Sequence, residues 1–452
     1  MKPKYVPVIG LEVHVELNTK SKMFCKCDAT YFGKEPNTST CPVCLGLPGA
    51  LPFINKKAIE NCIKIGLALN CSVVDYSNFE RKNYFYPDLP KGYQISQLRD
   101  PLCVGGYIDV EDDLGNIRKI RINRAHQEED TGKLTHTNGQ TLIDYNRSSV
   151  PLVEIVTEAD FTDPSQIKDY AKKLQQIFRY LGVSNADMER GDMRLEANIS
   201  VRQVPDDYTG LKNEEYLDLK DLPNYRVELK NINSFRFMVA AVEYEIKRQT
   251  EALEKGEKLA QETRGWNQVK KETFLQRSKE EAHDYRYFPE ADLPEMRISA
   301  DEVSKIKDEI PELPIAKAQR FESEYKIKRA DTKILTEDKA FSEKFEEILK
   351  LSDLESAKLA NYIINSKINI LEVEPSKIID EVKAKSAGVI SDESELEKIA
   401  QEAIDENPKA VSDFKAGREN VVMVLVGAVM KKTSGKADAG KVREILEKLL
   451  RE

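Results

Sequence analysis

The clearest alternation of hydrophobic and polar residues along the chain is GLEVHVEL, residues 10–17. Successive side chains of a β-strand point to opposite faces, so this period of two predicts a strand. The aliphatic residues would enter a core, and Glu12, His14 and Glu16 would share the other face. Two interpretations are open. One is the ordinary polar outer face of an antiparallel sheet, and the other is a site for a hard cation.

Further alternating runs continue to about residue 290 and indicate a mainly antiparallel β domain. They are YVPVIGLEVHVEL, GGYIDVEDD, RKIRINRAH, LVEIV and ANISVRQV. Between them, apolar residues recur at spacings of three and four, as in SQIKDYAKKLQQIFRYLGV. This spacing predicts helices at residues 56–69, 164–181 and 235–255.

The pattern changes after Pro289. Prolines punctuate the junction, and Lys, Glu, Leu, Ile and Ala dominate the rest of the chain. We expect a helical domain at residues 295–375 and a small helical tail at residues 376–452, in which SDESELEKIAQEAI opens on a helix N-cap. The predicted fold class is therefore α+β, with a β-rich domain at residues 1–294 ahead of two helical parts.

Composition narrows the class of protein. Hydrophobic residues make up 40% of the chain and charged residues 33%, as in soluble proteins, and the apolar run at residues 421–430 is too short to span a bilayer. The N-terminal segment lacks the long apolar core of an export signal, so we expect a cytoplasmic protein. The net charge of -9 gives no general attraction to polyanions, so any contact with a nucleic acid must be local.

Four of the seven cysteines form two close pairs, Cys25-Lys-Cys27 and Cys41-Pro-Val-Cys44. Both pairs lie in turn-rich sequence, which allows four sulfurs to converge on one tetrahedral zinc ion at roughly 2.3 Å. Because the protein would supply all four ligands, the zinc would be structural. The alternative is four incidental thiols. The other three cysteines are interpreted as small core residues.

Three other segments add acidic side chains. They are HQEED at residues 126–130, Glu154 within the apolar run VPLVEIV, and MRLEANIS with Glu196. A buried carboxylate is unfavourable alone, so Glu154 needs a cation or a partner such as Arg147. Carboxylates with one imidazole suit Mg²⁺, which also binds substrate phosphates, and this favours phosphoryl transfer. The sequence has no Walker loop, no G-x-G-x-x-G helix start and no kinase motif, so a nucleotide must bind by another scheme.

Two regions carry the mixture of cations, rings and amides that is expected around a nucleotide. RKNYFYPD and KGYQISQ lie at residues 81–88 and 91–97, and ELKNINSF ends a predicted strand at a helix start, where an anion is favoured. Each region is also compatible with a structural loop. The candidate ATP contacts are Lys82, Tyr84, Lys230 and Asn231.

Six long segments carry a family resemblance that covers nearly the whole chain. They are VIGLEVHVEL, RKNYFYPDLPKGYQISQ, HQEEDTGK, DYNRSSVPLVEIV, ELKNINSF and DYRYFPEADL. In this order they resemble the B subunit of the aspartyl/glutamyl-tRNA amidotransferases. The resemblance implies a β-rich cradle domain related to glutamine-synthetase-type sheets, then a helical domain and a helical tail. It also implies phosphorylation by ATP of the side-chain carboxylate of Glu on tRNA(Gln) or Asp on tRNA(Asn), after which ammonia displaces phosphate.

The resemblance also assigns roles to residues. His14, Glu129 and Glu154 would be Mg²⁺ ligands and catalytic residues, with Glu12 close by as a further catalytic residue and Glu196 as a further Mg²⁺ ligand. The four cysteines match a zinc site found in part of the family. An acyl phosphate offers ammonia a good leaving group, so the protein mainly has to position the reactants and neutralise charge.

The implied partners follow from what the chain lacks. It has no Cys-His pair around Cys103 and no Ser-Ser-Lys amidase signature, so the resemblance implies the family's amidase (A) subunit and its small bridging (C) subunit, besides a mischarged tRNA. Basic tail residues would contact tRNA phosphates, although a solvated helix end is an alternative. These residues are Lys431, Lys432, Lys436 and Lys441.

One departure from the family concerns residues 375–391, which are shorter than the usual family hairpin. Two other functions compete with the transamidase: a free-standing carboxylate-amine ligase that acts on a small acid, and a non-enzymatic, zinc-stabilised tRNA-binding scaffold. The helical domain and basic tail favour a macromolecular substrate over a small acid. The polar face around His14 and the lone Glu154 argue against a scaffold.

Overall fold

The computed structural model describes residues 5–205, 207–211, 215–278, 285–366, 368–387, 393–415, 418–433, 437 and 439–451. The chain forms two compact units, Met1–Ala316 and Lys317–Glu452. Among the described residues, every helix is too short or too polar to cross a membrane.

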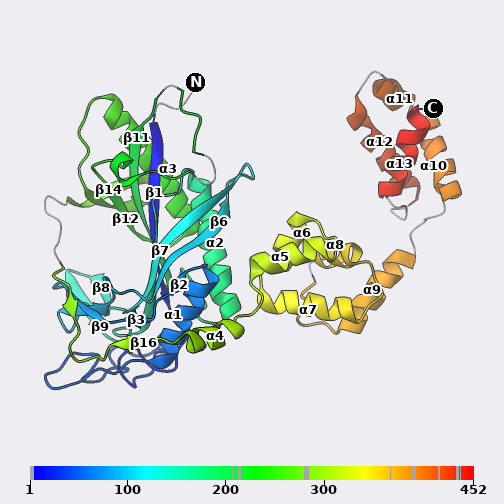
Figure 1. The fold of residues 1–452 in the computed structure, drawn as a ribbon. Helices are drawn as coiled ribbons and strands as arrows, with labels where there is room; N and C mark the ends of the chain where they lie inside the picture. The colour runs from blue at the N-terminus through cyan, green and yellow to red at the C-terminus, as the bar shows by residue number, and fades with distance from the viewer. Residues whose placement is uncertain are drawn as a thin grey trace. The chain divides into compact units, whose positions relative to one another are not determined.

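The first unit is built on a nine-stranded sheet within the described residues (Figure 1). The strand order is β14-β13-β12-β11-β1-β10-β7-β6-β2, and only the β12–β13 pair is parallel. The mainly antiparallel sheet expected from the alternating runs is therefore confirmed. The strands are β1 (Tyr5–Glu16), β2 (Ser72–Val73), β6 (Cys103–Glu111), β7 (Ile117–Glu129), β10 (Pro151–Thr157), β11 (Met193–Gln203), β12 (Val227–Ile232), β13 (Glu262–Asn267) and β14 (Glu272–Ser278).

Three helices pack against one face of this sheet, and they confirm the three predicted helices to within a residue at each end. They are α1 (Lys56–Ala68), α2 (Pro164–Leu181) and α3 (Phe235–Glu254). In α2, the Asp163 side chain and Gln166 form a capping box, and Gly182 ends the helix with a left-handed φ of 66°. The helices and strands bury their apolar residues in one core, which leaves the opposite face of the sheet to polar side chains.

Smaller elements complete the first unit. β4 (Glu80–Asn83) lies between β5 (Tyr93–Ser96) and β15 (Phe288–Pro289), while β3 (Tyr76–Ser77) pairs with β16 (Met296–Arg297). A hairpin of β8 (Lys133–Thr137) and β9 (Gln140–Asp144) turns at Asn138 and Gly139, whose φ angles of 47° and 76° are typical of a type I′ turn. A 3₁₀ helix, η1 (Leu219–Asp221), and α4 (Ala300–Asp308) also belong to this unit.

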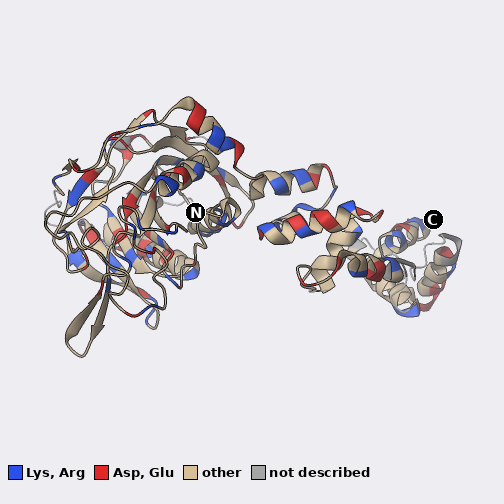
Figure 2. Cartoon of the chain, turned by 90° about the horizontal axis from the view of Figure 1, so that it is seen from below, with Lys and Arg blue, Asp and Glu red and all other residues tan. Residues whose placement is uncertain are grey.

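The second unit is helical, and its described residues form two separate hydrophobic cores. The first core involves α5 (Pro314–Ser323), which begins just before the unit boundary, α6 (Arg329–Leu335), α7 (Lys339–Lys350), α8 (Ser356–Ser366) and α9 (Pro375–Ala387). The second core involves α10 (Glu393–Glu406), α11 (Pro408–Lys415), η2 (Glu419–Val421), α12 (Val422–Lys432) and α13 (Ala439–Arg451). Figure 2 shows basic and acidic residues interspersed along these helices.

The division of the chain differs from the predicted boundaries at 294/295 and 375/376. Along the chain, the boundary between the two compact units falls between Ala316 and Lys317. Helix α9, which the prediction places in the tail, packs Ile378, Ile379 and Val382 into the same core as Phe321. The proline at the start of α9 begins a helix rather than a domain, because the apolar face of that helix is buried against α7 and α8. The N-cap predicted for SDESELEKIAQEAI lies outside the described residues.

Candidate active site and metal centre

The polar face of the large sheet gathers ionisable side chains from neighbouring strands. Directly paired residues of adjacent strands project to the same face. His14 of β1 is paired with Glu154 of β10 and with Arg194 of β11. Glu154 is in turn paired with His126 of β7, and Glu12 with Glu196 of β11. The alternation seen in β1 therefore continues across four strands.

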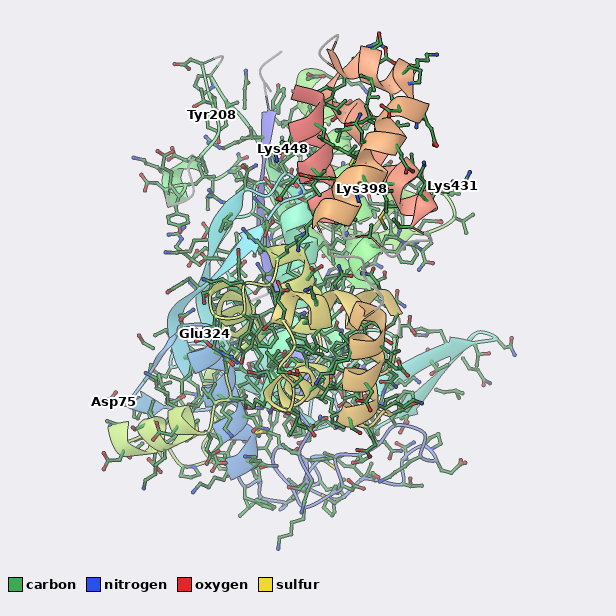
Figure 3. All side chains as sticks on the ribbon, turned by 90° about the vertical axis from the view of Figure 1, so that its right-hand side faces the viewer. Asp75, Tyr208, Glu324, Lys398, Lys431 and Lys448 are labelled. Carbon is green, nitrogen blue, oxygen red and sulfur yellow. The ribbon has the colours of Figure 1, made fainter. Side chains whose placement is uncertain are left out.

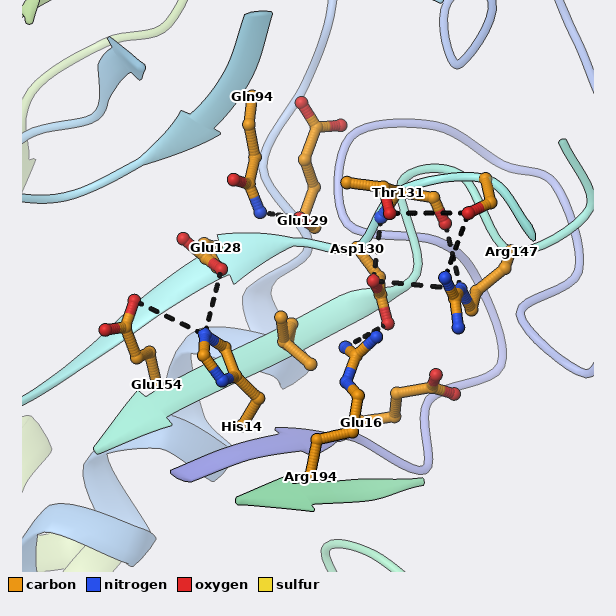
Figure 4. A network of polar contacts seen from close by, with 12 residues as sticks. His14, Glu16, Gln94, Glu128, Glu129, Asp130, Thr131, Arg147, Glu154 and Arg194 are labelled. Atoms are coloured by element: carbon orange, nitrogen blue, oxygen red, sulfur yellow. Dashed lines mark hydrogen bonds and ion pairs between the residues drawn. The ribbon is translucent and has the colours of Figure 1, made fainter. Parts of the chain in front are cut away.

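The first cluster on this face consists of His14, Glu128 and Glu154 (Figure 4). His14 Nε2 lies 3.8 Å from Glu128 Oε1 and 3.7 Å from Glu154 Oε2. His126 Nε2 lies 3.3 Å from the same Glu154 oxygen. One ligand atom from each of the three residues lies within 4.8 Å of the others. Two carboxylates and an imidazole are a donor set that fits Mg²⁺.

The electrostatics of the first cluster favour a cation. Burial lowers the pKa of His14, but the hydrogen bond and charge of Glu154 outweigh burial and raise the pKa to about 9. Burial raises the pKa of Glu154, but His126 and His14 hold it well below its usual value. Positive charge is therefore stabilised where the two carboxylates converge.

Glu129, predicted as a Mg²⁺ ligand, lies away from this cluster. Its carboxylate forms an ion pair with the Lys91 ammonium, 2.6 Å from Oε2, and accepts the Ile95 N–H at 2.9 Å. Figure 4 shows it beside Gln94 rather than beside His14. Adjacent residues of a strand face opposite sides, so β7 can present Glu128 or Glu129 to His14, but not both. His126 and Glu128 are two residues apart in HQEED and therefore face the same side of the strand. This spacing is the signal that could have identified Glu128.

A second cluster on the same face consists of Glu12, Glu196 and Glu228, again with one oxygen from each within 4.8 Å of the others. The Lys230 ammonium lies 2.8 Å from Glu196 Oε2 and 3.2 Å from Glu228 Oε1. Asn198 Nδ2 donates to Glu12 Oε1 at 2.8 Å. The structure thus groups Glu196 with Glu12 and Lys230 rather than with His14. Burial, then Glu154 and Glu196, raise the pKa of Glu12.

The other candidate nucleotide contacts, Lys82, Tyr84 and Asn231, differ in their surroundings. Burial lowers the pKa of Lys82, but the Glu128 and Glu154 charges outweigh burial and raise it well above its usual value. The Lys82 ammonium lies 5.4 Å from the centroid of the Tyr285 ring. Nothing in the sequence indicated that the segment of Tyr285 would lie beside Lys82. Tyr84 Oη is 3.4 Å from Gln94 Oε1. Asn231 is exposed, with a φ of 60°.

Arg147, the alternative partner of Glu154, is engaged elsewhere. Its Nε lies 3.7 Å from Asp130 Oδ1 and donates to the Thr131 carbonyl at 2.9 Å. Arg194 Nη2 reaches the other Asp130 oxygen at 2.6 Å (Figure 4). Among the described residues, the ion-pair partners of Glu154 are therefore the two histidines.

The four cysteine sulfurs of the predicted zinc site converge. Cys25, Cys27, Cys41 and Cys44 each place Sγ within 4.8 Å of the others. The Cys41 N–H donates to Cys44 Sγ at 3.1 Å. A hydrogen bond from the Cys25 thiol, then the Lys22 charge, lower the pKa of Cys44 to about 5. Four converging sulfurs, one of which favours the thiolate form, fit a tetrahedral zinc ion.

The lysines predicted to bind tRNA differ in their surroundings. Lys431 and Lys441 are exposed, and Lys431 is labelled on α12 in Figure 3. The Lys432 ammonium lies 2.9 Å from Glu402 Oε2 and 2.8 Å from Glu406 Oε1. Lys436 lies outside the described residues.

Comparison with known proteins defines the class of protein. Residues 7–304 match the model of the GatB/GatE catalytic domain, and residues 325–450 match that of the GatB domain. The B subunit of the aspartyl/glutamyl-tRNA(Asn/Gln) amidotransferase of Thermodesulfovibrio yellowstonii is 45% identical over 491 residues, covering 99% of this chain and 100% of the relative. Those of Dehalococcoides mccartyi and Thermotoga petrophila are each 42% identical, covering 99% of both chains. The chain belongs to the family of amidotransferase B subunits.

The alignment to the first of these relatives is longer than the 452-residue chain. It therefore contains positions that this chain lacks.

Proposed function

We propose that this chain is the component of a tRNA-dependent amidotransferase that activates the side-chain carboxylate of Glu on tRNA(Gln) or of Asp on tRNA(Asn), and amidates it with ammonia. The observation that carries the proposal is the convergence of His14, Glu128 and Glu154 on the polar face of a sheet whose family is that of the amidotransferase B subunits. The likeness to glutamine-synthetase-type sheets and a cytoplasmic location stay predictions.

The reaction has two steps. The γ-phosphoryl group of ATP is transferred to a side-chain carboxylate oxygen, and ADP leaves. The ammonia lone pair then attacks the carbonyl carbon, the bond from carbon to the phosphorylated oxygen breaks, and phosphate leaves as the nitrogen loses a proton. Mg²⁺, when bound, would supply charge neutralisation for the phosphates.

The chain's own residues divide this work. His14, Glu128 and Glu154 would hold one Mg²⁺, and Glu12, Glu196 and Glu228 offer a second group of carboxylate oxygens. Lys82 and Lys230 bring positive charge to the first and second clusters respectively. The two lysine ammonium groups would orient phosphate oxygens and offset the negative charge that develops during phosphoryl transfer. Tyr84 and Asn231 remain candidate ATP contacts.

The partners are proposed from the family and from the sequence. Ammonia must reach the acyl phosphate unprotonated, because the ammonium ion has no lone pair. The amidase subunit would supply it, with the small bridging subunit joining the two larger chains. Exposed tail lysines such as Lys431 and Lys441 would contact tRNA phosphates. The loop that carries the four cysteines would hold structural zinc.

The proposal is tested with the complex reconstituted from this chain, the amidase subunit and the bridging subunit. The complex is given mischarged Glu-tRNA(Gln) or Asp-tRNA(Asn) with ATP, and either glutamine or ammonium chloride as the nitrogen source. The amino acid is then identified after mild hydrolysis of the ester. We expect Gln or Asn to form with either nitrogen source, and His14→Ala to abolish its formation with both.

Glu16→Gln is the matched control, because Glu16 shares the strand and face of His14. Glutamine keeps the shape of the side chain and an oxygen that accepts the Tyr31 hydroxyl, which lies 3.1 Å from both Glu16 oxygens. Its activity should stay near that of the wild type. Normal turnover by His14→Ala with ammonium chloride would reject the assigned site.

A further inference from the structure

Lys22 lies in the loop that carries the four cysteines, and its side chain is completely buried, with 0% of its surface exposed. A buried ammonium is strongly unfavourable unless an anion lies nearby. Among the described residues, two polar atoms reach the Lys22 ammonium: Cys44 Sγ at 3.8 Å and the carbonyl oxygen of Tyr145 at 3.4 Å. A carbonyl carries only a partial charge, so the sulfur is the atom of the two that can supply a full negative charge, as a thiolate.

The backbone around Lys22 fixes where the ammonium lies. The Lys22 N–H donates to the Cys27 carbonyl at 2.9 Å, and the Asn55 side chain donates to the Lys22 carbonyl at 3.2 Å. Asn55 is also the N-cap of α1, where it accepts the Ala58 N–H. The following residues, Met23 and Phe24, are buried in the main core. Lys22 is thus anchored from both sides, and its side chain can reach only a small volume.

We propose that Lys22 is the charge partner of the zinc centre: its buried ammonium offsets the negative charge of the thiolates and thereby increases the affinity of the loop for zinc. Zn²⁺ with four thiolates carries two excess negative charges. In a buried site a nearby cation stabilises such a charge far more than it would in water. The inference rests on the zinc site proposed above, and it assigns Lys22 a positioning role rather than a ligand role.

The same ammonium connects the zinc loop to a second segment. Tyr145 follows the β8–β9 hairpin, and three residues later the Ser148 hydroxyl donates to the Cys44 carbonyl at 3.3 Å. Lys22 and Ser148 therefore hold Cys44 against this segment from two sides. A neutral side chain at position 22 loses the charge and this tether together, whereas arginine keeps the charge.

The experiment compares variants of the full-length chain by zinc competition against a chelator of known affinity. Lys22→Met should weaken zinc binding about tenfold to a hundredfold, as loss of an outer partner of a metal ligand does. Lys22→Arg should retain most of the affinity. The matched control is Lys26→Met, which removes a charge from an exposed position between Cys25 and Cys27 and should change the affinity less than about twofold.

Substitution with Co²⁺ supplies a second readout that does not depend on catalysis. The absorption of four-sulfur coordination should persist in Lys22→Met at saturating Co²⁺, which would show that the ligand set survives. If Lys22→Met does not fold, Lys22→Gln replaces it as the neutral variant. Wild-type zinc affinity in the neutral variant would overturn the inference, and so would an equal loss in Lys26→Met. Wild-type protein without zinc would instead reject the zinc site itself.

Discussion

The cysteine site and the first carboxylate cluster are built over very different lengths of chain. The cysteine loop takes all its sulfurs from residues 25–44, and its ligands are presented by turns. The first carboxylate cluster takes His14 from β1, Glu128 from β7 and Glu154 from β10, and its ligands meet only when these strands pair in register. The loop therefore needs its ion more than the sheet does, whereas the sheet must fold before its cluster exists. Breaking each centre in turn separates these two modes of assembly.

The largest expected effect comes from the strand parity that places Glu128, but not Glu129, beside His14. Glu128→Gln should lower the rate of amidation by about 100-fold to 1000-fold in the complex, because a ligand and a negative charge leave the site. Binding of Mn²⁺ as a Mg²⁺ surrogate, followed by electron paramagnetic resonance, should weaken in parallel.

Glu129→Gln is the comparison variant. It removes the ion pair with Lys91 but leaves the first cluster intact, so Mn²⁺ binding should remain close to that of the wild type. A loss of Mn²⁺ affinity in Glu129→Gln with normal binding in Glu128→Gln would reverse the assignment.

Removal of zinc should have the next largest effect, and it should act on stability. Cys44→Ser should lower the free energy of unfolding of the first unit by about 3 kcal/mol in zinc-containing buffer, the contribution of a ligand present at about a hundredfold over its Kd. Chemical denaturation followed by circular dichroism measures this change. A chelator should destabilise the wild type by a similar amount and leave Cys44→Ser unchanged; equal sensitivity of both proteins would contradict the loop site.

The carboxylate cluster should instead reveal itself through pH. In Mg²⁺-free protein the pKa of His14 rises from its usual 6.5 to about 9 on folding, so the folded state holds the proton more tightly than the unfolded state. The resulting stabilisation, roughly 3 kcal/mol, is fully present below pH 6.5 and is lost as the pH rises through about 9. Urea unfolding from pH 6 to pH 10 measures it. His14→Gln should flatten this part of the profile, and an unchanged slope would show that the histidine stays neutral.

The smallest expected effect concerns the attachment of the cysteine loop to its neighbours. The Asn37 side chain bonds the Ile143 carbonyl and the Tyr145 N–H at 3.0 Å and 2.8 Å, with a φ of 59° that glycine tolerates. Asn37→Gly should lower the free energy of unfolding by about 1 kcal/mol while leaving zinc affinity nearly unchanged. Asn138→Gly, at another left-handed position, is the control and should be almost neutral. A large loss of zinc affinity in Asn37→Gly would show that the loop is not self-contained.

The sequence predicted the cysteine site better than the carboxylate site for a physical reason. Ligand spacing over twenty residues is a local property, and the four sulfurs meet as expected. The choice between Glu128 and Glu129 depends on the register of β7 against β10. The only local hint in HQEED is that His126 and Glu128 are two residues apart and so face the same side of the strand. For the same reason the pairing of Lys230 with Glu196 and Glu228 became visible only in the folded sheet.

Helical propensity identified the helices well but not their grouping. The ends of α1, α2 and α3 fall within a residue of the predicted ends, because helix caps and apolar spacing depend on residues that are close together in the sequence. The membership of α9 in the core around Phe321 depends on which buried face it meets, and a proline at its start gives no information about that.

The hairpin tip at Asn138 and Gly139 is a suitable position for attaching a label or inserting a peptide. Its turn needs only residues that adopt a left-handed backbone, and most side chains of β8 and β9 are exposed. Such a tip tolerates an inserted peptide or a cysteine carrying a fluorophore, since few contacts depend on it. A label there would report on the approach of tRNA or of another protein chain without altering either metal centre.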